Sequence, residues 1–217
     1  MDELVSRLSR LDSCAVSDAL DKLGLPGSVT GIQRLSTDRR IAGRVLTVTL
    51  SLAGGRPGAS RHLCTAAIEA ANPGDIIVVE QRTGVDAASW GGNLSIGAQV
   101  RGVGGVIVEG PVRDLDDSRR LDFPVFARSA TARTARGRIV EVATNETITV
   151  GDVPVTPGDY VVADASAVVF IARNEILPVL ETAEAIMQRE EAMAAAIRDG
   201  QPISKVMGAN YERMLNK

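Results

Sequence analysis

Short apolar runs, separated by residues that favour turns, recur along the whole chain. Such runs, rich in valine and isoleucine, predict β-strands. They cover residues 41–51, 75–80, 105–108, 124–127, 139–142, 147–150, 160–163 and 167–171. The run Ile-Ile-Val-Val after Asp75 is apolar at every position, which is typical of a strand covered on both faces. Turns are expected at 110–111, 145–146, 151–152 and 157–159, and a glycine-rich loop at 52–59.

Elsewhere apolar residues recur every three or four positions, as on one face of a helix. This spacing predicts helices over residues 4–11, 17–23, 62–71, 94–101 and 174–199, with one more opened by Arg113 and Asp114. Ser13 or Ser17 is suited to cap the second helix, and Gly24 to end it. Gly200 is suited to end the last helix, whose later, less apolar part is expected to project toward a neighbouring subunit.

This mixture of helices and strands predicts an α/β fold with N-terminal helices and a long C-terminal helix. No repeat, low-complexity segment or clear linker divides the 217 residues, so one domain over residues 1–217 is expected. A net charge of −3 gives no reason to expect nucleic acid as a partner. No apolar run approaches the roughly 18 residues of a membrane span, and the first residues lack the features of a signal peptide. We therefore expect a cytoplasmic protein without membrane contact.

The scarce reactive residue types exclude several kinds of chemistry. Cys14 and Cys64 stand apart, without zinc-ligand spacing, and are interpreted as structural thiols. His62 is the only histidine, which excludes a multi-histidine metal site within one chain; it is interpreted as structural or solvated. The three lysines, at 22, 205 and 217, lie outside the predicted core strands, where a desolvated Schiff-base amine would be expected. Carbon–carbon bond cleavage by this chain would therefore use a metal instead of an imine.

The candidate site lies between Trp90 and Asp117. Two glycines precede the helix that starts near Asn93 and Leu94, and the free N–H groups of such a start suit a carboxylate. A strand, a Gly-Pro pair and then Arg113-Asp114 follow. Arg113 offers a planar fork for an anion. Asp114 and Asp117, three positions apart on a helix, can present hard oxygens to a divalent cation.

Each of these residues also has a structural interpretation. Asp114 is suited to cap or stabilise a helix start, and Asp117 to be a solvated surface acid. Spacing alone leaves both interpretations open. A basic patch, formed by Arg128, Arg133, Arg136 and Arg138, is interpreted as a solvated connection, with a second site for substrate carboxylates or a subunit contact as the alternative. Asp164, between two apolar strands, is interpreted as structural.

Gly92, followed by twenty residues and then Arg113-Asp114-x-x-Asp117, resembles a family signature. The family contains the regulator of ribonuclease activity A and the metal-dependent 4-hydroxy-4-methyl-2-oxoglutarate / 4-carboxy-4-hydroxy-2-oxoadipate aldolases. Further blocks resemble the family in the same order: Ser17-Asp-Ala-Leu-Asp-Lys-Leu-Gly24, Ala71-Asn-Pro-Gly-Asp75, Phe123-Pro-Val-Phe-Ala127 and Pro157-Gly-Asp-Tyr-Val-Val-Ala-Asp164. The resemblance covers roughly residues 12–173. It implies a compact, swivelling-domain-like β/β/α sandwich, assembled as a homotrimer or hexamer with sites at subunit interfaces.

The resemblance also implies an activity, namely a Mg²⁺- or Mn²⁺-dependent pyruvate aldolase. Such enzymes cleave 4-hydroxy-2-oxo acids and decarboxylate oxaloacetate, because both reactions pass through a pyruvate enolate. Asp114 matches the metal-binding aspartate, and Arg113 matches the arginine that contacts the oxo group and the enolate. Asp117 matches the third, acidic member, which acts through metal-bound water. The amides of Asn93 and Leu94 match those that hold the pyruvate carboxylate.

Two features of the signature bear on the activity. The characterised aldolases carry aspartate where this chain has Gly92, and that aspartate is implicated in proton transfer, so retro-aldol cleavage is expected to suffer more than decarboxylation. A carboxylate from an adjacent subunit often completes the site, and Glu190 or Glu191 is the candidate here. The alternative function is a non-catalytic regulator that binds a ribonuclease or helicase. The retained Arg113-Asp114 pair argues against it, since the regulatory branch lacks the metal-binding aspartate.

Overall fold

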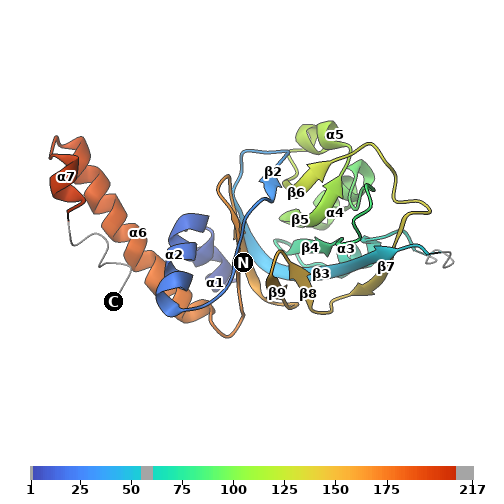
Figure 1. Cartoon of the computed structure of the whole chain (residues 1–217), viewed down its shortest axis with the longest axis horizontal. Coiled ribbons are helices and arrows are strands. Elements are labelled where there is room, and N and C mark those ends of the chain that lie inside the picture. Colours follow the sequence, from blue (N-terminus) through green and yellow to red (C-terminus); the bar gives the residue numbers. More distant parts are fainter. Residues whose placement is uncertain (1, 55–60, 209–217) are drawn as a thin grey trace.

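A curved mixed sheet forms the centre of the molecule, as Figure 1 shows for the computed structural model, which describes residues 2–54 and 61–208. Its strands run in the order β1-β11-β10-β3-β4-β5-β6-β2, and β7 pairs with β3 beside this path. The strands β3, β4, β5 and β6 are parallel to one another. A separate hairpin is formed by β8 and β9. The predicted α/β fold is confirmed.

The bounds of the strands are β1 Ser28–Val29, β2 Gln33–Arg34, β3 Ile41–Leu52, β4 Ile76–Glu80, β5 Gly105–Val112, β6 Val125–Ala130, β7 Ile139–Thr144, β8 Ile148–Val150, β9 Val153–Val155, β10 Tyr160–Ala163 and β11 Val168–Ile171. The bounds of the helices are α1 Glu3–Leu8, α2 Ser13–Leu23, α3 Thr65–Ala70, α4 Gly92–Arg101, α5 Leu115–Arg120, α6 Ile176–Arg198 and α7 Ile203–Val206.

The central strand β4 is apolar throughout because both of its faces are covered. Successive side chains of a strand point to opposite faces. Ile77 and Val79 pack into the cluster formed with α3 and α4, whereas Ile76 and Val78 pack into the cluster formed with the β8–β9 hairpin. Hairpin, sheet and helices therefore lie in layers, in agreement with the expected β/β/α sandwich.

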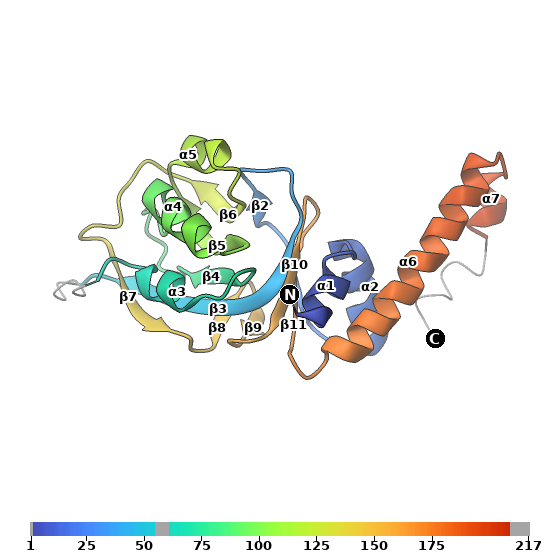
Figure 2. The ribbon, with the colours of Figure 1, turned by 180° about the vertical axis from the view of Figure 1, so that it is seen from behind.

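The long strand β3 joins two parts of the molecule. Its beginning, Ile41 to Arg44, pairs antiparallel with β10, and its continuation from Val45 to Thr49 pairs parallel with β4. Next to β10 and β11, the helices α1, α2 and α6 form a third apolar cluster. Beyond this cluster α6 extends away from the sheet, and α7 lies beside its far end (Figures 1 and 2).

Several predicted elements differ from the observed ones. The second helix starts at Ser13 instead of 17, because Asp12, not Ser13 or Ser17, caps it by accepting a hydrogen bond of 2.8 Å from the Ala15 amide. The first helix, predicted over 4–11, spans Glu3–Leu8, and the helix predicted over 62–71 is confined to Thr65–Ala70. The strands β1, β2 and β9 and the helix α7 were not predicted, because elements of two to four residues carry too little pattern to be recognised.

The turn predicted at 110–111 is wrong. Gly110 and Pro111 lie within β5, where the pairing with β6 shifts register between Val108 and Pro111. A strand tolerates Gly and Pro at such an irregularity, where the ladder is interrupted. Much of the loop expected at 52–59 lies outside the described residues, and Leu52 belongs to β3.

Within residues 2–54 and 61–208, no helix has the length and apolar character needed to cross a bilayer.

Gly24 ends α2 in the left-handed conformation, with φ of +68°, as predicted. The last helix, predicted over 174–199, spans Ile176–Arg198, and its buried face begins with Ile176 and ends at Ile186. The apolar face predicted to pack on the body of the molecule is therefore confirmed.

Candidate functional site

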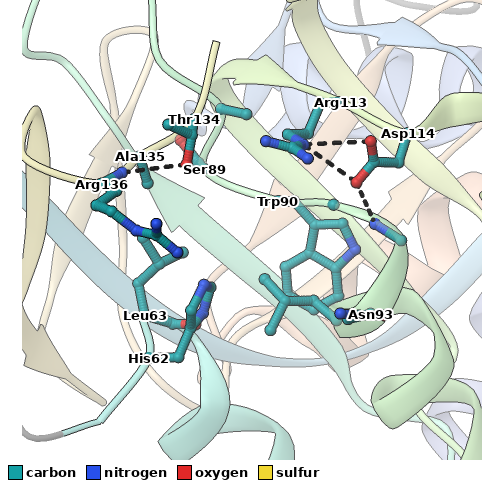
Figure 3. Close-up of a pocket in the computed structure, with 14 residues that line it drawn as sticks. His62, Leu63, Ser89, Trp90, Asn93, Arg113, Asp114, Thr134, Ala135 and Arg136 are labelled. Atoms are coloured by element: carbon teal, nitrogen blue, oxygen red, sulfur yellow. Dashed lines mark hydrogen bonds and ion pairs between the residues drawn. The ribbon is translucent and has the colours of Figure 1, made fainter. Parts of the chain in front are cut away.

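A cavity of about 490 Å³ lies at the carboxyl end of β5. The start of α4, the Arg113–Asp114 junction, His62 and Leu63, and the segment 134–136 line it. Side-chain positions are drawn in Figure 3. In parallel sheets the loops that follow the strands converge at this edge, together with helix starts. The parallel pairing of β4, β5 and β6 thus explains why segments distant in sequence meet here.

The start of α4 is built to approach the Arg113–Asp114 pair closely. Its Gly92 amide donates a hydrogen bond of 3.0 Å to Oδ2 of Asp114. A Cβ atom added at Gly91 would lie 2.8 Å from the same oxygen and 3.2 Å from Cγ of Arg113. Because real Cβ atoms do not approach an oxygen so closely, a side chain at 91 would displace the pair. Glycine at 91 therefore permits the contact between helix and carboxylate.

The amides of Asn93 and Leu94 have no acceptor within their own helix, since they belong to its first turn. If the helix began earlier, the Leu94 amide would donate to the Trp90 carbonyl, but this carbonyl accepts a hydrogen bond of 3.0 Å from the Arg113 amide. The Asn93 amide would likewise donate to the Ser89 carbonyl, which accepts from the Cys64 thiol at 3.7 Å. Together with the positive end of the helix dipole, these amides suit an anion in the cavity.

Asp114 adopts a backbone conformation that few residues other than glycine accept. Its φ is +57°, and it occupies the N-cap position of α5 without capping the helix through its side chain. The carboxylate instead receives Nε of Arg113 at 3.1 Å, in addition to the Gly92 amide (Figure 3). The capping interpretation of its side chain is therefore wrong. An unusual φ that turns a carboxylate into a cavity is the kind of strain that functional sites retain.

Arg113 and Asp114 are both partly exposed, at 38% and 34% of their side-chain surface. Only Nε of Arg113 is used in their contact, so the rest of the guanidinium fork remains available for an anion. Likewise, a carboxylate oxygen accepts more than one partner, and Asp114 retains acceptor capacity. The pair is thus held in position by the α4 amide and keeps unused donor and acceptor groups.

Asp117 lies next to Gly92, although it belongs to the neighbouring hollow lined by α5 and by Ala130 to Ala132. A Cβ atom added at Gly92 would be 2.7 Å from Oδ2 of Asp117. The Asp117 carboxylate also forms an ion pair with Arg120, one turn later on α5. The structure therefore brings Gly92, Asp114 and Asp117 together, as the spacing of the motif predicts.

Within the described part of the chain, no three His, Cys, Asp or Glu side chains are grouped so that they could hold a metal ion. The carboxylates of Asp114 and Asp117 are the hard oxygen donors at this edge, and such donors suit Mg²⁺ or Mn²⁺. With two protein ligands, the remaining positions of an octahedral shell would be taken by water, substrate or a second chain. The two carboxylates are suitable donors for Mg²⁺ or Mn²⁺, but they do not by themselves complete the set of ligands.

Behind the cavity, a buried polar network fixes α4 against α5. Nε1 of Trp90 donates to Oγ of Ser95 at 2.9 Å, and this oxygen lies 3.0 Å from Oγ of Ser118. The Trp90 ring stacks on Phe123 with centroids 6.2 Å apart. Serines inside two helices look unremarkable in sequence, and nothing in their spacing indicated that they support the site.

The cavity also contains residues to which the sequence interpretation gave no role there. Nδ1 of His62, interpreted as structural or solvated, lies 3.1 Å from the Leu63 carbonyl oxygen, and the residue lines the cavity. Arg136 lines it too, whereas Arg128, from the same predicted basic patch, forms an ion pair of 2.9 Å with Glu109. The patch is therefore divided: part is structural and part faces the cavity.

Asp164 has the structural role expected of it. Its carboxylate accepts hydrogen bonds from the amide and the hydroxyl of Ser13, at 2.8 and 2.7 Å, and from the Ser166 amide at 2.9 Å. Burial raises the pKa of this carboxyl, but these hydrogen bonds outweigh burial and hold the pKa below its usual value.

Cys64 is buried, as a structural thiol should be, whereas Cys14 is exposed.

The sequence of this chain is similar to a known family and to several known proteins. The family described as RraA-like: Aldolase/RraA matches residues 13–170. A protein of Halalkalibacterium halodurans named "Putative 4-hydroxy-4-methyl-2-oxoglutarate aldolase" is 30% identical over 201 residues, which cover 91% of this chain and 90% of that protein. Protein DlpA of Legionella pneumophila is 27% identical over 94% of this chain, and the chain spans 33% of its length.

Solved structures agree on the fold. An uncharacterized protein from Pseudomonas syringae superposes with a TM-score of 0.86 at 24% identity, covering 96% of this chain and 98% of that one. Streptomyces coelicolor RraAS2, described as an unusual member of the RNase ES inhibitor RraA protein family, superposes with a TM-score of 0.78 at 25% identity. That match covers 88% of this chain and 95% of RraAS2.

Proposed function

Because the chain belongs to the RraA-like family, Aldolase/RraA, we propose that it is a divalent-metal-dependent lyase acting on 2-oxo acids. Its reactions would be decarboxylation of oxaloacetate and cleavage of 4-hydroxy-2-oxo acids of the 4-hydroxy-4-methyl-2-oxoglutarate type. The single observation that carries the proposal is the junction of three groups in one cavity: the first-turn amides of α4, the Arg113 guanidinium and the Asp114 carboxylate. The relatives named as such aldolases support it.

Each of these groups has a separate task in the proposed reaction. The amides of Asn93 and Leu94 bind the carboxylate next to the 2-oxo group. Arg113 places fixed positive charge beside the 2-oxo oxygen, which becomes negative when the C3–C4 bond breaks and the pyruvate enolate forms. In the decarboxylation, CO₂ leaves with no electrons from that bond, and a proton returns to C3. Loss of one such electrostatic group costs about 2.7–4 kcal/mol of barrier in other enzymes.

Asp114 and Asp117 are the residues that would hold a Mg²⁺ or Mn²⁺ ion. When bound, the ion supplies a Lewis acid for the 2-oxo and carboxylate oxygens of the substrate. Arg113 orients the Asp114 carboxylate by its Nε contact. We further propose that an adjacent chain of a trimer or hexamer contributes a third carboxylate to the metal site. Glu190 and Glu191, both exposed on α6, are the candidates for this carboxylate.

Asp117 is proposed to take over the acid–base task that the family's aldolases give to the residue at position 92. A Cβ atom added at Gly92 would lie 2.7 Å from Oδ2 of Asp117, so this carboxylate lies next to the position where the family's aldolases carry a further aspartate. Retro-aldol cleavage, which needs proton removal from the 4-hydroxyl, then depends on Asp117. Decarboxylation needs less acid–base assistance and should tolerate its loss better.

The test is pyruvate release from oxaloacetate and from 4-hydroxy-4-methyl-2-oxoglutarate, with Mg²⁺ or Mn²⁺ and with EDTA. Turnover that requires the metal and disappears in Asp114→Ala supports the proposal. The ratio of the two rates reports whether cleavage or decarboxylation dominates. A folded protein that neither binds Mn²⁺ nor releases pyruvate would refute it.

A second candidate function is that of a regulator that binds a ribonuclease, and the likeness to RraAS2 favours it. The two functions are separable by measurement. A regulator would bind its ribonuclease with the same affinity after Asp114→Ala, because partner binding does not require that carboxylate. Loss of turnover in the same variant would assign the cavity to catalysis instead.

A further inference from the structure

Arg136 lies across the cavity from Arg113. It follows β6 in the segment that leads to β7, and its side chain reaches into the cavity from the side opposite the Arg113–Asp114 pair (Figure 3). Its backbone is held in place: the Arg136 amide lies 3.3 Å from Oγ1 of Thr134, and the Ala135 carbonyl accepts the amides of Arg138 and Ile139 at 2.9 and 3.0 Å. Ala135 packs against the core below. The guanidinium is thus carried by an anchored turn.

The charges around the cavity are unequally paired. Its ionisable lining consists of His62, Arg113, Asp114 and Arg136. Arg113 is offset by Asp114 at 3.1 Å, whereas no carboxylate of the residues described here forms an ion pair with Arg136. Leu63, Trp90 and Leu94 contribute apolar side chains to the same cavity. A guanidinium without a carboxylate partner in such a cavity favours a planar anion.

We propose that Arg136 binds the second carboxylate of a 4-hydroxy-2-oxo dicarboxylic acid of the 2-oxoglutarate type and thereby selects such dicarboxylic substrates over monocarboxylic ones. This inference rests on the proposed function, which assigns the first carboxylate to the start of α4. Arg136 is a specificity-determining residue in this scheme. In such a substrate the second carboxylate stays on the released fragment and takes no part in the bond that breaks, so Arg136 contributes to substrate binding and not to the chemical step; the departing carboxylate of oxaloacetate is not assigned to Arg136.

The test compares two stable ligands of equal chain length, 2-oxoglutarate and 2-oxopentanoate, which differ by the second carboxylate. Their dissociation constants are measured by calorimetry in the presence of Mg²⁺, so no turnover is needed. A charge-assisted hydrogen bond changes an affinity by roughly tenfold or more. We expect the wild type to prefer 2-oxoglutarate by that factor, and Arg136→Gln to abolish the preference while leaving 2-oxopentanoate binding unchanged.

Two further variants distinguish the contact from a general effect of charge. Arg136→Lys should retain part of the preference, because a single ammonium replaces the fork. Arg133→Gln removes a positive charge of the same segment that pairs with Asp86 at 3.4 Å and does not line the cavity, so the preference should remain. Circular dichroism verifies that each variant is folded.

The outcomes separate the inference from the proposed function. A wild type that binds both ligands equally, or an Arg136→Gln variant that keeps the preference, would overturn the assignment of Arg136 alone. A wild type that binds neither ligand would overturn the carboxylate site at α4 and, with it, both proposals.

Discussion

The backbone amide of Gly92 donates a hydrogen bond of 3.0 Å to Oδ2 of Asp114, which lies 22 residues later in the chain. This contact joins the start of α4 to the junction of β5 and α5. It fixes a carboxylate at the positive end of one helix and in the N-cap position of another. One hydrogen bond therefore joins the two parts of the sequence motif, Gly92 and the Arg113–Asp114 pair.

Asp114→Asn should test the charge of this group with little change of shape. The amide side chain retains an oxygen for the Gly92 N–H but loses the negative charge that a cation requires. We expect Mn²⁺ binding, followed by electron paramagnetic resonance, to weaken by more than about tenfold, and pyruvate release to fall with it. Asp116→Asn is the control, because Asp116 pairs with Arg119 and is 82% exposed. Equal Mn²⁺ affinities of the two variants would contradict the assignment.

Moving the carboxylate from position 117 to position 92 should test whether either position can supply the acid–base group. Asp117→Ala is expected to reduce retro-aldol cleavage by about 10²-fold or more, as loss of an acid–base group does. The double variant Gly92→Asp, Asp117→Ala should recover at least part of that rate. In Gly92→Asp alone the added Cβ would lie 2.7 Å from Oδ2 of Asp117, so the tip of the Asp117 side chain must shift to admit it. A double variant no better than Asp117→Ala would show that the positions are not equivalent.

Arg113→Gln should lower the rate of pyruvate formation by about 10²–10³-fold, the usual loss when one preorganised electrostatic group is removed. The substrate KM should change less, since the charge on the 2-oxo oxygen develops as the bond breaks. Steady-state kinetics with oxaloacetate measures both. The matched control is Arg119→Gln, whose guanidinium pairs with Asp116 at 2.8 Å on the surface of α5. A change of KM without a change of kcat would exclude the proposed role.

Asp164 should make the free energy of unfolding depend on pH in the acid range. Burial raises its pKa, but the hydrogen bonds from Ser13 and Ser166 lower it more, so the folded pKa lies below the usual value of about 3.9. The stabilisation by the ionised carboxylate is present above that usual value and is lost as pH falls through the folded pKa.

Asp164→Asn should therefore cost about 1–3 kcal/mol of unfolding free energy near pH 7, and progressively less at acid pH. Urea denaturation of both proteins at each pH provides the difference. Asp38→Asn, on an exposed side chain, serves as the control and should cost little. A cost that does not depend on pH would refute the role of the charge.

The two thiols should react at different rates. Burial, together with the negative charge of Glu141, raises the pKa of Cys64 well above its usual value, so its reactive thiolate is scarce as well as inaccessible. Cys14 is exposed. Titration with a chromogenic disulfide should release about one equivalent from the native protein and the second only after unfolding. Cys14→Ser should remove the fast phase; a fast phase that persists in this variant would show that Cys64 is reached in the native state.

The sequence predicted those elements whose pattern is strong and local. The run after Asp75 became β4 because a continuously apolar segment is stable only between two covering layers. The helical spacing before Gly200 became α6, and Gly24 ended α2 because it accepts a positive φ at little cost. The Gly110–Pro111 pair misled the prediction, since these residues mark both turns and strand irregularities, and only the pairing with β6 distinguishes them.

For the site, the sequence by itself determined the residue types and their order: two glycines at a helix start, then Arg113, Asp114 and Asp117 after a buried strand. Only the tertiary structure decided which of them touch, because the distance from Gly92 to Asp114 depends on the parallel pairing that aligns the ends of β4, β5 and β6. The same pairing brought Arg136 to the wall of the cavity, from a segment whose sequence resembles any exposed basic connection. Local chemistry is encoded in neighbouring residues, whereas the opposite sides of a cavity come from segments that only the fold brings together.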